Sequence, residues 1–201
     1  PPLVRQLGDR VFNPPLKSFK TEKELLDDFF HVMMKKDPDV LTGWFFMGAD
    51  MKVLFDACKR HNWNAGKRMS PHGSVRYQFD DYSQCIKGRI TIDLMTVFCR
   101  LWRVKNGQLP GQSLKDVSQF VLQNDEKFDL EDGHDTYYTD LGRYIDYNIQ
   151  DVALLPKLDK MLNCIDHFLN LQHIVQCDFI TTPWVTRLAT VLLLRDEEFD
   201  R

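Results

Sequence analysis

The chain has 201 residues, of which 43% are hydrophobic and 27% are charged, and its formal net charge at pH 7 is −3. This length and balance predict one ordinary globular domain with its own core, and they exclude a disordered or fibrous chain. Because 29 aspartates and glutamates outnumber 26 lysines and arginines, no bulk positive field attracts nucleic acid. Any contact with nucleic acid therefore has to be local.

The cysteines and the apolar runs indicate the cellular compartment of the protein. Five cysteines occur, an odd number, and none forms a C-x-x-C pair, which is typical of a reduced intracellular protein. The apolar run Leu188 to Leu194 is too short to span a bilayer, so no membrane role is expected. We expect an intracellular protein, in the cytoplasm of a prokaryote or of a virus-infected host cell.

The beginning of the sequence divides into an extended entry and a helix. Pro1-Pro2 and Pro14-Pro15 predict an extended entry segment over residues 1–20, ahead of a single domain over residues 21–201. Thr21 to Glu24 has the spacing of a capping box and precedes apolar residues at helical period, which predicts a helix that ends before Asp37.

A strand and a second helix follow. The β-branched and aromatic run of residues 40–46 predicts a buried strand, and residues 50–61 return to helical spacing. Asp50 is therefore expected near the C-terminal end of a strand, where open α/β sheets place their ligands. Residues 62–88 are polar and contain glycines, which predicts a loop or a small hairpin around residues 74–79.

In the second half of the sequence a predicted strand is again followed by a predicted helix. Residues 89–94 predict another strand and residues 95–102 a helix, so the order of elements favours an α/β layer. Ser113 is a plausible N-cap of a short amphipathic helix, and residues 124–139 are acidic and irregular. A long helical stretch covers residues 141–176, with Pro156 as a bend or a boundary, and a last apolar helix covers residues 184–194.

Two segments carry residues suited to chemistry. The first is Gly43 to Asp50 at a predicted strand end, and the second is Tyr144 to Asp151 on a predicted helix. Tyr147 and Asp151 are four residues apart and share a helix face. A phenol and a carboxylate on one face can orient a metal-bound water and hold a hard divalent ion, which prefers oxygen ligands.

These segments, in this order, resemble the exonuclease domain of family-B DNA polymerases. Residues 37–44, followed by Asp50, resemble that family's second exonuclease motif, and Tyr147-x-x-x-Asp151 resembles the third. Tyr-x-x-x-Asp alone would occur often by chance, so the specificity comes from the ordered set. The resemblance covers roughly residues 20–195 and also includes Lys67 to His72, the strand entering Asp93, and Ser113-Leu114.

The resemblance implies an RNase H-like α/β fold in which carboxylates bind two divalent metal ions, Mg²⁺ or Mn²⁺. It implies hydrolysis of the 3′-terminal phosphodiester of single-stranded DNA, in proofreading for the polymerase domains of a parent protein. By resemblance Asp50 and Asp151 are metal ligands, Tyr147 orients the attacking water, and Asp93 is a secondary candidate. No polymerase active-site motif occurs in the sequence.

The sequence departs from the family pattern in two places. Phe45 and Ala49 stand where the second motif usually carries Asn and Phe, which puts the strand contacts of that Asn in doubt. No Asp-x-Glu, the first motif, occurs upstream of Asp50. These departures imply a fold without its first strands and a chain that is inactive unless another segment supplies the missing carboxylates.

Several plainer interpretations stay open. Asp50 could cap a helix, Asp93 could be a turn acid, and Tyr147 with Asp151 could be a buried tyrosine and a surface acid. A basic and aromatic set could contact nucleic acid or lie in a solvated loop. That set comprises Trp63, Lys67 and Arg68, with Phe45 as a further candidate. The alternative functions are a non-catalytic RNase H-like module that binds nucleic acid or serves structure, and a stand-alone DEDD-type nuclease acting on RNA or other DNA ends.

Overall fold

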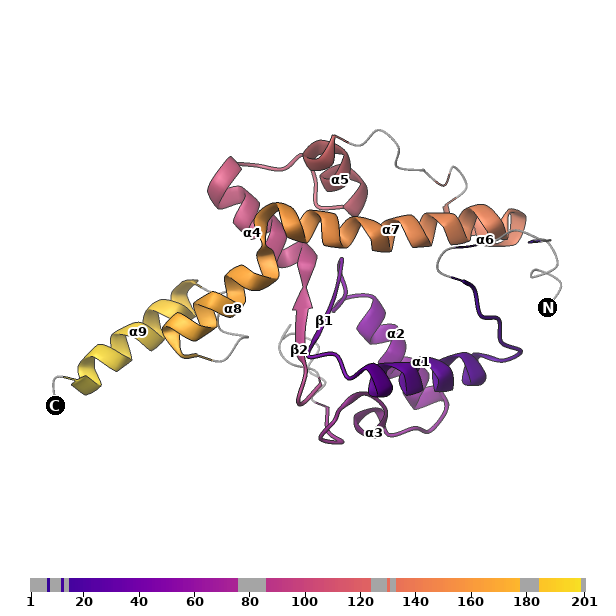
Figure 1. Ribbon diagram of the computed structural model, residues 1–201, viewed down its shortest axis with the longest axis horizontal. Coiled ribbons are helices and arrows are strands. Elements are labelled where there is room, and N and C mark those ends of the chain that lie inside the picture. Colours follow the sequence, from indigo (N-terminus) through magenta and orange to yellow (C-terminus); the bar gives the residue numbers. More distant parts are fainter. Residues whose placement is uncertain are drawn as a thin grey trace.

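The computed structural model describes residues 7, 12, 15–75, 86–123, 130, 133–177 and 185–199. In this part of the chain, helices surround a two-stranded parallel sheet (Figure 1). In chain order the elements are α1 (Glu22–Lys36), β1 (Val40–Gly43), α2 (Asp50–Arg60), α3 (Ala65–Met69), β2 (Ile90–Asp93), α4 (Leu94–Asn106), α5 (Leu114–Leu122), η2 (Gly133–Asp135), α6 (Thr136–Thr139), α7 (Leu141–Leu162), α8 (Cys164–Val175) and α9 (Val185–Phe199).

The two strands run parallel, and both end at the same edge of the sheet. Val40 lies opposite Ile90, and Gly43 lies opposite Asp93. Parallel strands need a crossover connection, and here α2 and α3 belong to it. We call the end marked by Gly43 and Asp93 the carboxyl edge, because each strand leaves the sheet there toward its following helix.

The sheet separates two hydrophobic clusters. Val40, Ile90 and Ile92 contact one cluster, whereas Leu41 contacts the other, as expected for side chains that alternate along a strand. The first cluster contains Val97, Phe98, Leu101, Val117, Val121, Leu158, Cys164 and Phe168, from α4, α5, α7 and α8. The second contains Leu26, Phe30, Met33, Met51, Phe55, Ala57, Cys58, Met69 and Ile86, mostly from α1, α2 and α3. The architecture is therefore mixed α/β and mostly helical, which confirms the predicted class.

Capping side chains fix the starts of the helices that the sequence predicted. Thr21 Oγ1 accepts a hydrogen bond from the Glu24 amide at 3.2 Å, and Ser113 Oγ accepts one from the Asp116 amide at 3.0 Å. Each bond satisfies a backbone N–H that has no partner inside its own helix.

The long helical stretch is interrupted at a different residue from the predicted one. Pro156 lies inside α7, and the break between α7 and α8 is at Asn163, which has a φ of 48°. Asn tolerates this left-handed backbone better than most residues, and a left-handed residue ends an α-helix. The Asp159 side chain then accepts a hydrogen bond from the Ile165 amide at 3.0 Å, which replaces a bond lost at the break.

Other boundaries also differ from the predicted ones. The strand after Pro38 ends at Gly43 instead of residue 46, and the expected loop of residues 62–88 contains α3, which Asn64 caps. Val75 and Ile86 form an antiparallel bridge, and the remainder of the predicted hairpin lies outside the described residues. The region predicted as irregular contains η2 and α6, and no described helix is long and apolar enough to cross a membrane.

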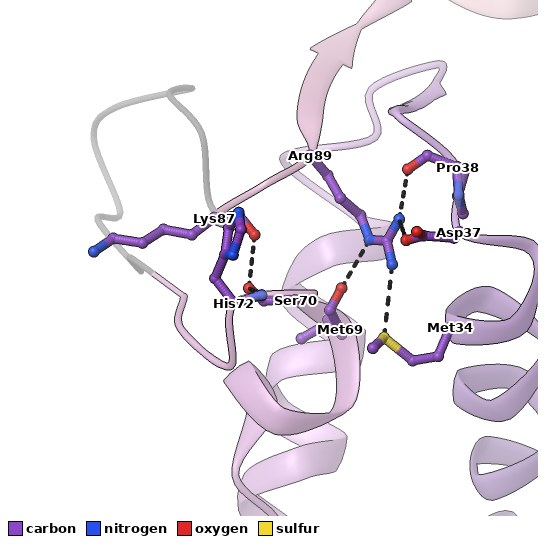
Figure 2. Close-up of polar contacts among 8 residues, drawn as sticks. All are labelled: Met34, Asp37, Pro38, Met69, Ser70, His72, Lys87 and Arg89. Atoms are coloured by element: carbon purple, nitrogen blue, oxygen red, sulfur yellow. Dashed lines mark hydrogen bonds and ion pairs between the residues drawn. The ribbon is translucent and has the colours of Figure 1, made fainter.

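The buried side chain of Arg89 connects three segments at the other end of the sheet (Figure 2). Arg89 is 3% exposed. Its Nε donates to the Met69 carbonyl at 2.9 Å, and its Nη1 donates to the Pro38 carbonyl at 2.6 Å. Nη1 also pairs with Asp37 Oδ1 at 2.9 Å, and Nη2 lies 3.6 Å from Met34 Sδ. One guanidinium therefore joins the end of α1, the start of β1 and the end of α3 to the start of β2.

We predict that Arg89→Ala lowers the free energy of unfolding by about 3 kcal/mol, because two backbone carbonyls lose their donor in a buried place. Asp37→Asn should cost less than about 1 kcal/mol, because the Asp37 side chain is 66% exposed and Asn also tolerates the left-handed backbone there. Urea unfolding followed by circular dichroism measures both values. If the two variants lose the same free energy of unfolding, the hydrogen bonds from Arg89 to the two carbonyls are not its main contribution to stability.

Candidate active site

Asp50 is the first residue of α2, and it follows the turn of residues 44–49 that leaves the carboxyl edge. The N-cap of α2 is Ala49, which offers no side-chain hydrogen bond, so the interpretation of Asp50 as a simple cap is wrong. The Asp50 carboxylate forms no ion pair with the described residues. Although Asp50 keeps exposed surface, desolvation by the surrounding protein raises the pKa of its carboxyl group.

Asp93, the last residue of β2, is buried and committed to backbone contacts. Its Oδ1 accepts from the Thr96 amide at 3.4 Å, which caps α4, and its Oδ2 accepts from the Met47 amide at 3.3 Å. Desolvation raises the pKa of Asp93, while the hydrogen bonds from these amides oppose that shift. Asp93 therefore fastens the turn before Asp50 to the start of α4.

Tyr147 and Asp151 lie on the face of α7 that also enters the core. Leu154 and Leu158 are 2% and 0% exposed, and Asp151 and Tyr147 precede them on the same helical stripe. Both residues are half-buried, and Oδ1 of Asp151 is shielded from solvent. The stripe therefore directs Asp151 toward the body of the domain, which disagrees with its interpretation as a surface acid.

The carboxyl edge and α7 are neighbours through α4. Helix α4 continues directly from β2, and it packs against both β1 and α7. In the view of Figure 1, α7 passes the end of the sheet at which β1 stops. Within the described ranges, no group of three or more His, Cys, Asp or Glu side chains could hold a metal ion.

The basic and aromatic candidates lie at the opposite end of α2 from Asp50. Helix α2 has 11 residues, which corresponds to a length of about 16 Å. Beyond its C-terminus, Trp63 packs against Phe30 at 6.2 Å between ring centroids, and the Arg68 guanidinium lies 4.1 Å from the Trp63 ring. Arg68 also pairs with Asp27. The structure therefore does not bring Trp63, Arg68 or the adjacent Lys67 to the carboxyl edge.

Phe45, in the turn before Asp50, has an unusual backbone. Its φ is 56°, a left-handed value that costs a non-glycine residue roughly 1–2 kcal/mol. Its ring covers Gly48, where an added β-carbon would lie 2.4 Å from the Phe45 Cζ atom. The Phe45 side chain is 46% exposed. Asn, the residue that the resembling motif usually carries here, is among the few that tolerate this backbone.

One contact of this turn has no signal in the sequence. Trp44 Nε1 donates to the Gln112 carbonyl at 2.9 Å, across 68 residues of chain, and the Trp44 ring lies 6.0 Å from that of Phe98. The turn is thereby fixed at two points, to the loop before α5 by Trp44 and to the end of β2 by the bond between Met47 and Asp93.

Residues 5–117 match the family model described as DNA polymerase family B, exonuclease domain. This match covers more than half of the chain and includes Asp50 and Asp93. The chain belongs to this family. Membership implies the RNase H-like fold, and the parallel strands with helices on both faces agree with it.

Three relatives of this family-B exonuclease domain are DNA polymerases. The DNA-directed DNA polymerase of Enterobacteria phage T4 is 28% identical over 181 residues, which is 87% of this chain and 20% of the relative. That of Escherichia phage RB69 is 27% identical over 77% of this chain and 17% of the relative. The DNA polymerase of Thermococcus kodakarensis is 28% identical over 73% of this chain and 9% of the relative. The chain thus spans a fifth or less of the length of these relatives.

We predict that Asp50→Asn raises the melting temperature of this family-B exonuclease domain at pH 7 in the absence of divalent metal. The folded state holds the Asp50 proton more tightly than the unfolded state, because desolvation raises the pKa of this carboxyl group above its ordinary value of 3.8, so stability falls as the pH rises through and above that value. The gain over wild type should vanish below that value, where both states are protonated. Thermal unfolding between pH 3 and 7 measures it.

The matched control for Asp50→Asn is Asp56→Asn on the same helix, which loses the ion pair with Lys59 and should bring no gain. A pH-independent gain in Asp50→Asn, or a loss of stability at pH 7, would contradict the prediction.

The left-handed backbone of Phe45 gives a second prediction. Phe45→Ala and Phe45→Asn both remove the ring, but only Asn is favoured at a φ of 56°. We expect Phe45→Asn to be more stable than Phe45→Ala by about 1 kcal/mol in urea unfolding. If the two variants are equally stable, backbone strain at Phe45 is negligible and the prediction is wrong.

Proposed function

We propose that this chain carries two of the three acidic motifs of a 3′–5′ exonuclease, with Asp50 and Asp151 as metal ligands and Tyr147 as the residue that orients the attacking water. The substrate is the 3′ end of single-stranded DNA, and the reaction is hydrolysis of the terminal phosphodiester. The observation that carries this proposal is the carboxylate of Asp50, which begins α2 beside the carboxyl edge and is used neither as a cap nor in an ion pair among the described residues.

The electrostatics of Asp50 support its assignment as a ligand. A desolvated carboxylate with a raised pKa costs stability when it is ionised, and a divalent cation offsets that cost. Two divalent ions, Mg²⁺ or Mn²⁺, would supply a water of lowered pKa and would stabilise the leaving 3′ oxygen. Asp93 acts as a positioning residue, because its two backbone contacts hold the turn that leads to Asp50.

The ligand set needs carboxylates that the described residues do not contribute. We propose that a segment carrying Asp-x-Glu completes it. Among the described residues β1 pairs only with β2, so the other edge of β1 offers backbone donors and acceptors to a further strand. A strand paired at that edge can bring its own acidic residues to the carboxyl edge, beside Asp50. The sheet would then gain strands beyond the two that the described residues form.

The context that we propose is proofreading within a larger polymerase, inside a prokaryotic or virus-infected cell. The polymerases of two phages and one archaeon support this context, since each contains a stretch similar to this chain as a small part of its length. We assign residues 21–201 to the exonuclease domain and residues 1–20 to its entry segment. The partners are the polymerase domains of the parent protein and the 3′ end of the strand under repair.

A non-catalytic nucleic-acid-binding module is the second candidate. The observation that favours it is the lack of any group of three potential metal ligands in the described part of the chain. In that case the fold would be retained for binding or structure, without cleavage. A stand-alone nuclease acting on RNA would instead cleave an RNA oligonucleotide better than a DNA oligonucleotide of the same sequence.

The test is release of nucleotides from a 3′-labelled single-stranded DNA with Mg²⁺ or Mn²⁺. Two proteins are compared: this chain alone, and this chain fused behind the stretch that precedes the matched region of the phage T4 relative. We expect the fusion to cleave. Asp151→Asn in the fusion should lower the rate about a thousandfold, because a metal ligand is lost. Tyr147→Phe should lower it about a hundredfold, because the ring stays and only the hydroxyl is removed.

Asp159→Asn, also on α7, is the matched control and should leave the rate within about twofold of the parent fusion. A folded fusion that binds divalent metal but does not cleave DNA or RNA would favour the non-catalytic module. Cleavage that survives Asp151→Asn would remove Asp151 from the site.

A further inference from the structure

A pair of adjoining pockets runs along α4, beside the loop that precedes α5. One has a volume of about 220 Å³ and the other about 200 Å³. They share Cys99, Arg103 and Gln112. On one side the wall is a single face of α4, from Met95 to Arg103, and on the other side it is the loop of residues 108–112. The two together form one elongated hollow, which we call the α4 pocket.

The lining of the α4 pocket is suited to an anion. Among the described residues that line it, the charged side chains are those of Arg100 and Arg103, which are three residues apart on one helix face, and none is a carboxylate. The amides of Gln108 and Gln112 add neutral donors. The planar fork of an arginine guanidinium matches two oxygens of a phosphate or a carboxylate group, so two arginines in a concave site suit an oxyanion of this kind.

The far wall of the α4 pocket is held in place by close contacts. The Trp44 indole donates to the Gln112 carbonyl at 2.9 Å, and an added β-carbon at Gly111 would lie 2.3 Å from Asp116 Oδ2. A larger residue at this position would require the Asp116 carboxylate to move. The Asp116 carboxylate accepts a hydrogen bond from the Ser113 hydroxyl at 2.7 Å. A preformed wall needs little ordering when a ligand binds.

The α4 pocket begins next to the candidate active site. Met95 and Thr96 line its inner end, and the Thr96 amide donates to Asp93 at the carboxyl edge. Desolvation raises the pKa of the Cys99 thiol, with opposing influences from Arg103, which lowers it, and from Asp93, which raises it. Cys99 therefore lies within electrostatic reach of both residues. From Thr96 to Arg103 the helix rises about 10 Å, so the pocket leads away from the carboxyl edge along α4.

We propose that the α4 pocket binds a phosphate group, with Arg103 and Arg100 as its charged donors. The inference rests on the proposed function for the identity of the ligand: a phosphodiester of the DNA strand whose 3′ end reaches Asp50 and Asp151. The nucleoside 5′-monophosphate released by cleavage offers the same chemistry. In either case the pocket contributes local positive charge to a chain whose net charge is −3.

The test is binding without cleavage, with the full chain in EDTA. A 5′-fluorescent single-stranded oligodeoxynucleotide is titrated by anisotropy at several salt concentrations, and radiolabelled dAMP is titrated by equilibrium dialysis. Arg103→Gln should weaken binding of at least one probe about tenfold. For the oligonucleotide it should also reduce the slope of log K against log salt by about 0.7, which corresponds to one phosphate contact on a single strand.

Two variants control for charge and folding. Arg103→Lys keeps the positive charge but removes the planar guanidinium that can bind two oxygens at once. The salt slope should therefore stay near that of wild type, and affinity should fall less than in Arg103→Gln. Lys23→Gln removes an exposed charge in the first turn of α1 and should change neither affinity nor slope. Thermal unfolding of each variant verifies the fold, since Arg103 is an exposed residue in the last turn of α4.

The outcomes separate this inference from the proposed function. If Arg103→Gln weakens binding of the oligonucleotide, the ligand of the pocket is a phosphodiester of the strand. If Arg103→Gln weakens binding of dAMP, the ligand is the nucleoside monophosphate that cleavage releases. If neither probe depends on Arg103, or if neither binds, the phosphate pocket is wrong, even where the fusion protein cleaves DNA and Asp151→Asn stops it. If binding depends on Arg103 but no form of the protein cleaves, the pocket stands and the exonuclease proposal fails.

Discussion

The burial of Arg89 is the constraint on which the arrangement of the strands depends. A guanidinium removed from water has to find acceptors, and here they are the carbonyls of Met69 and Pro38 and the carboxylate of Asp37. These acceptors belong to the end of α3 and to the junction of α1 with β1. Satisfying one cation therefore aligns the start of β2 with the start of β1, and the parallel register of the two strands follows.

At the opposite edge of the sheet two aspartates have different roles, because their surroundings differ. Asp93 is buried, and each of its carboxylate oxygens accepts a hydrogen bond from a backbone amide. At Asp50 desolvation raises the pKa of the carboxyl group, a hydrogen bond from its own backbone amide opposes that shift, and no ion pair with a described residue neutralises its charge. At this edge one carboxylate holds the turn, and the other is the ligand in the function that we propose. The α4 pocket adds the positive charge of Arg100 and Arg103 near the same edge.

The departures from the family pattern are concentrated in the turn between β1 and α2. Phe45 occupies a left-handed position that suits Asn, and its ring covers Gly48 instead of leaving the turn open. The carboxyl edge of this chain is consequently more apolar than the motif predicts. Upstream of Asp50 the sequence has no Asp-x-Glu, and the described residues contain no group of three potential metal ligands.

The sequence by itself determined the features that depend on neighbouring residues. Helix starts at Thr21 and Ser113, the strand entering Gly43, and the placement of Asp50 and Asp151 were predictable, because capping and hydrophobic period act over a few residues. Only the tertiary structure decided that Asn163 rather than Pro156 ends α7, that Arg68 pairs with Asp27, and that Asp93 fastens the turn. The pairing of Arg68 and the role of Asp93 depend on contacts between residues that are far apart in the sequence, by 41 positions in the first case and 46 in the second. At the break between α7 and α8, the packing of the helices selects among backbone conformations that local propensity permits.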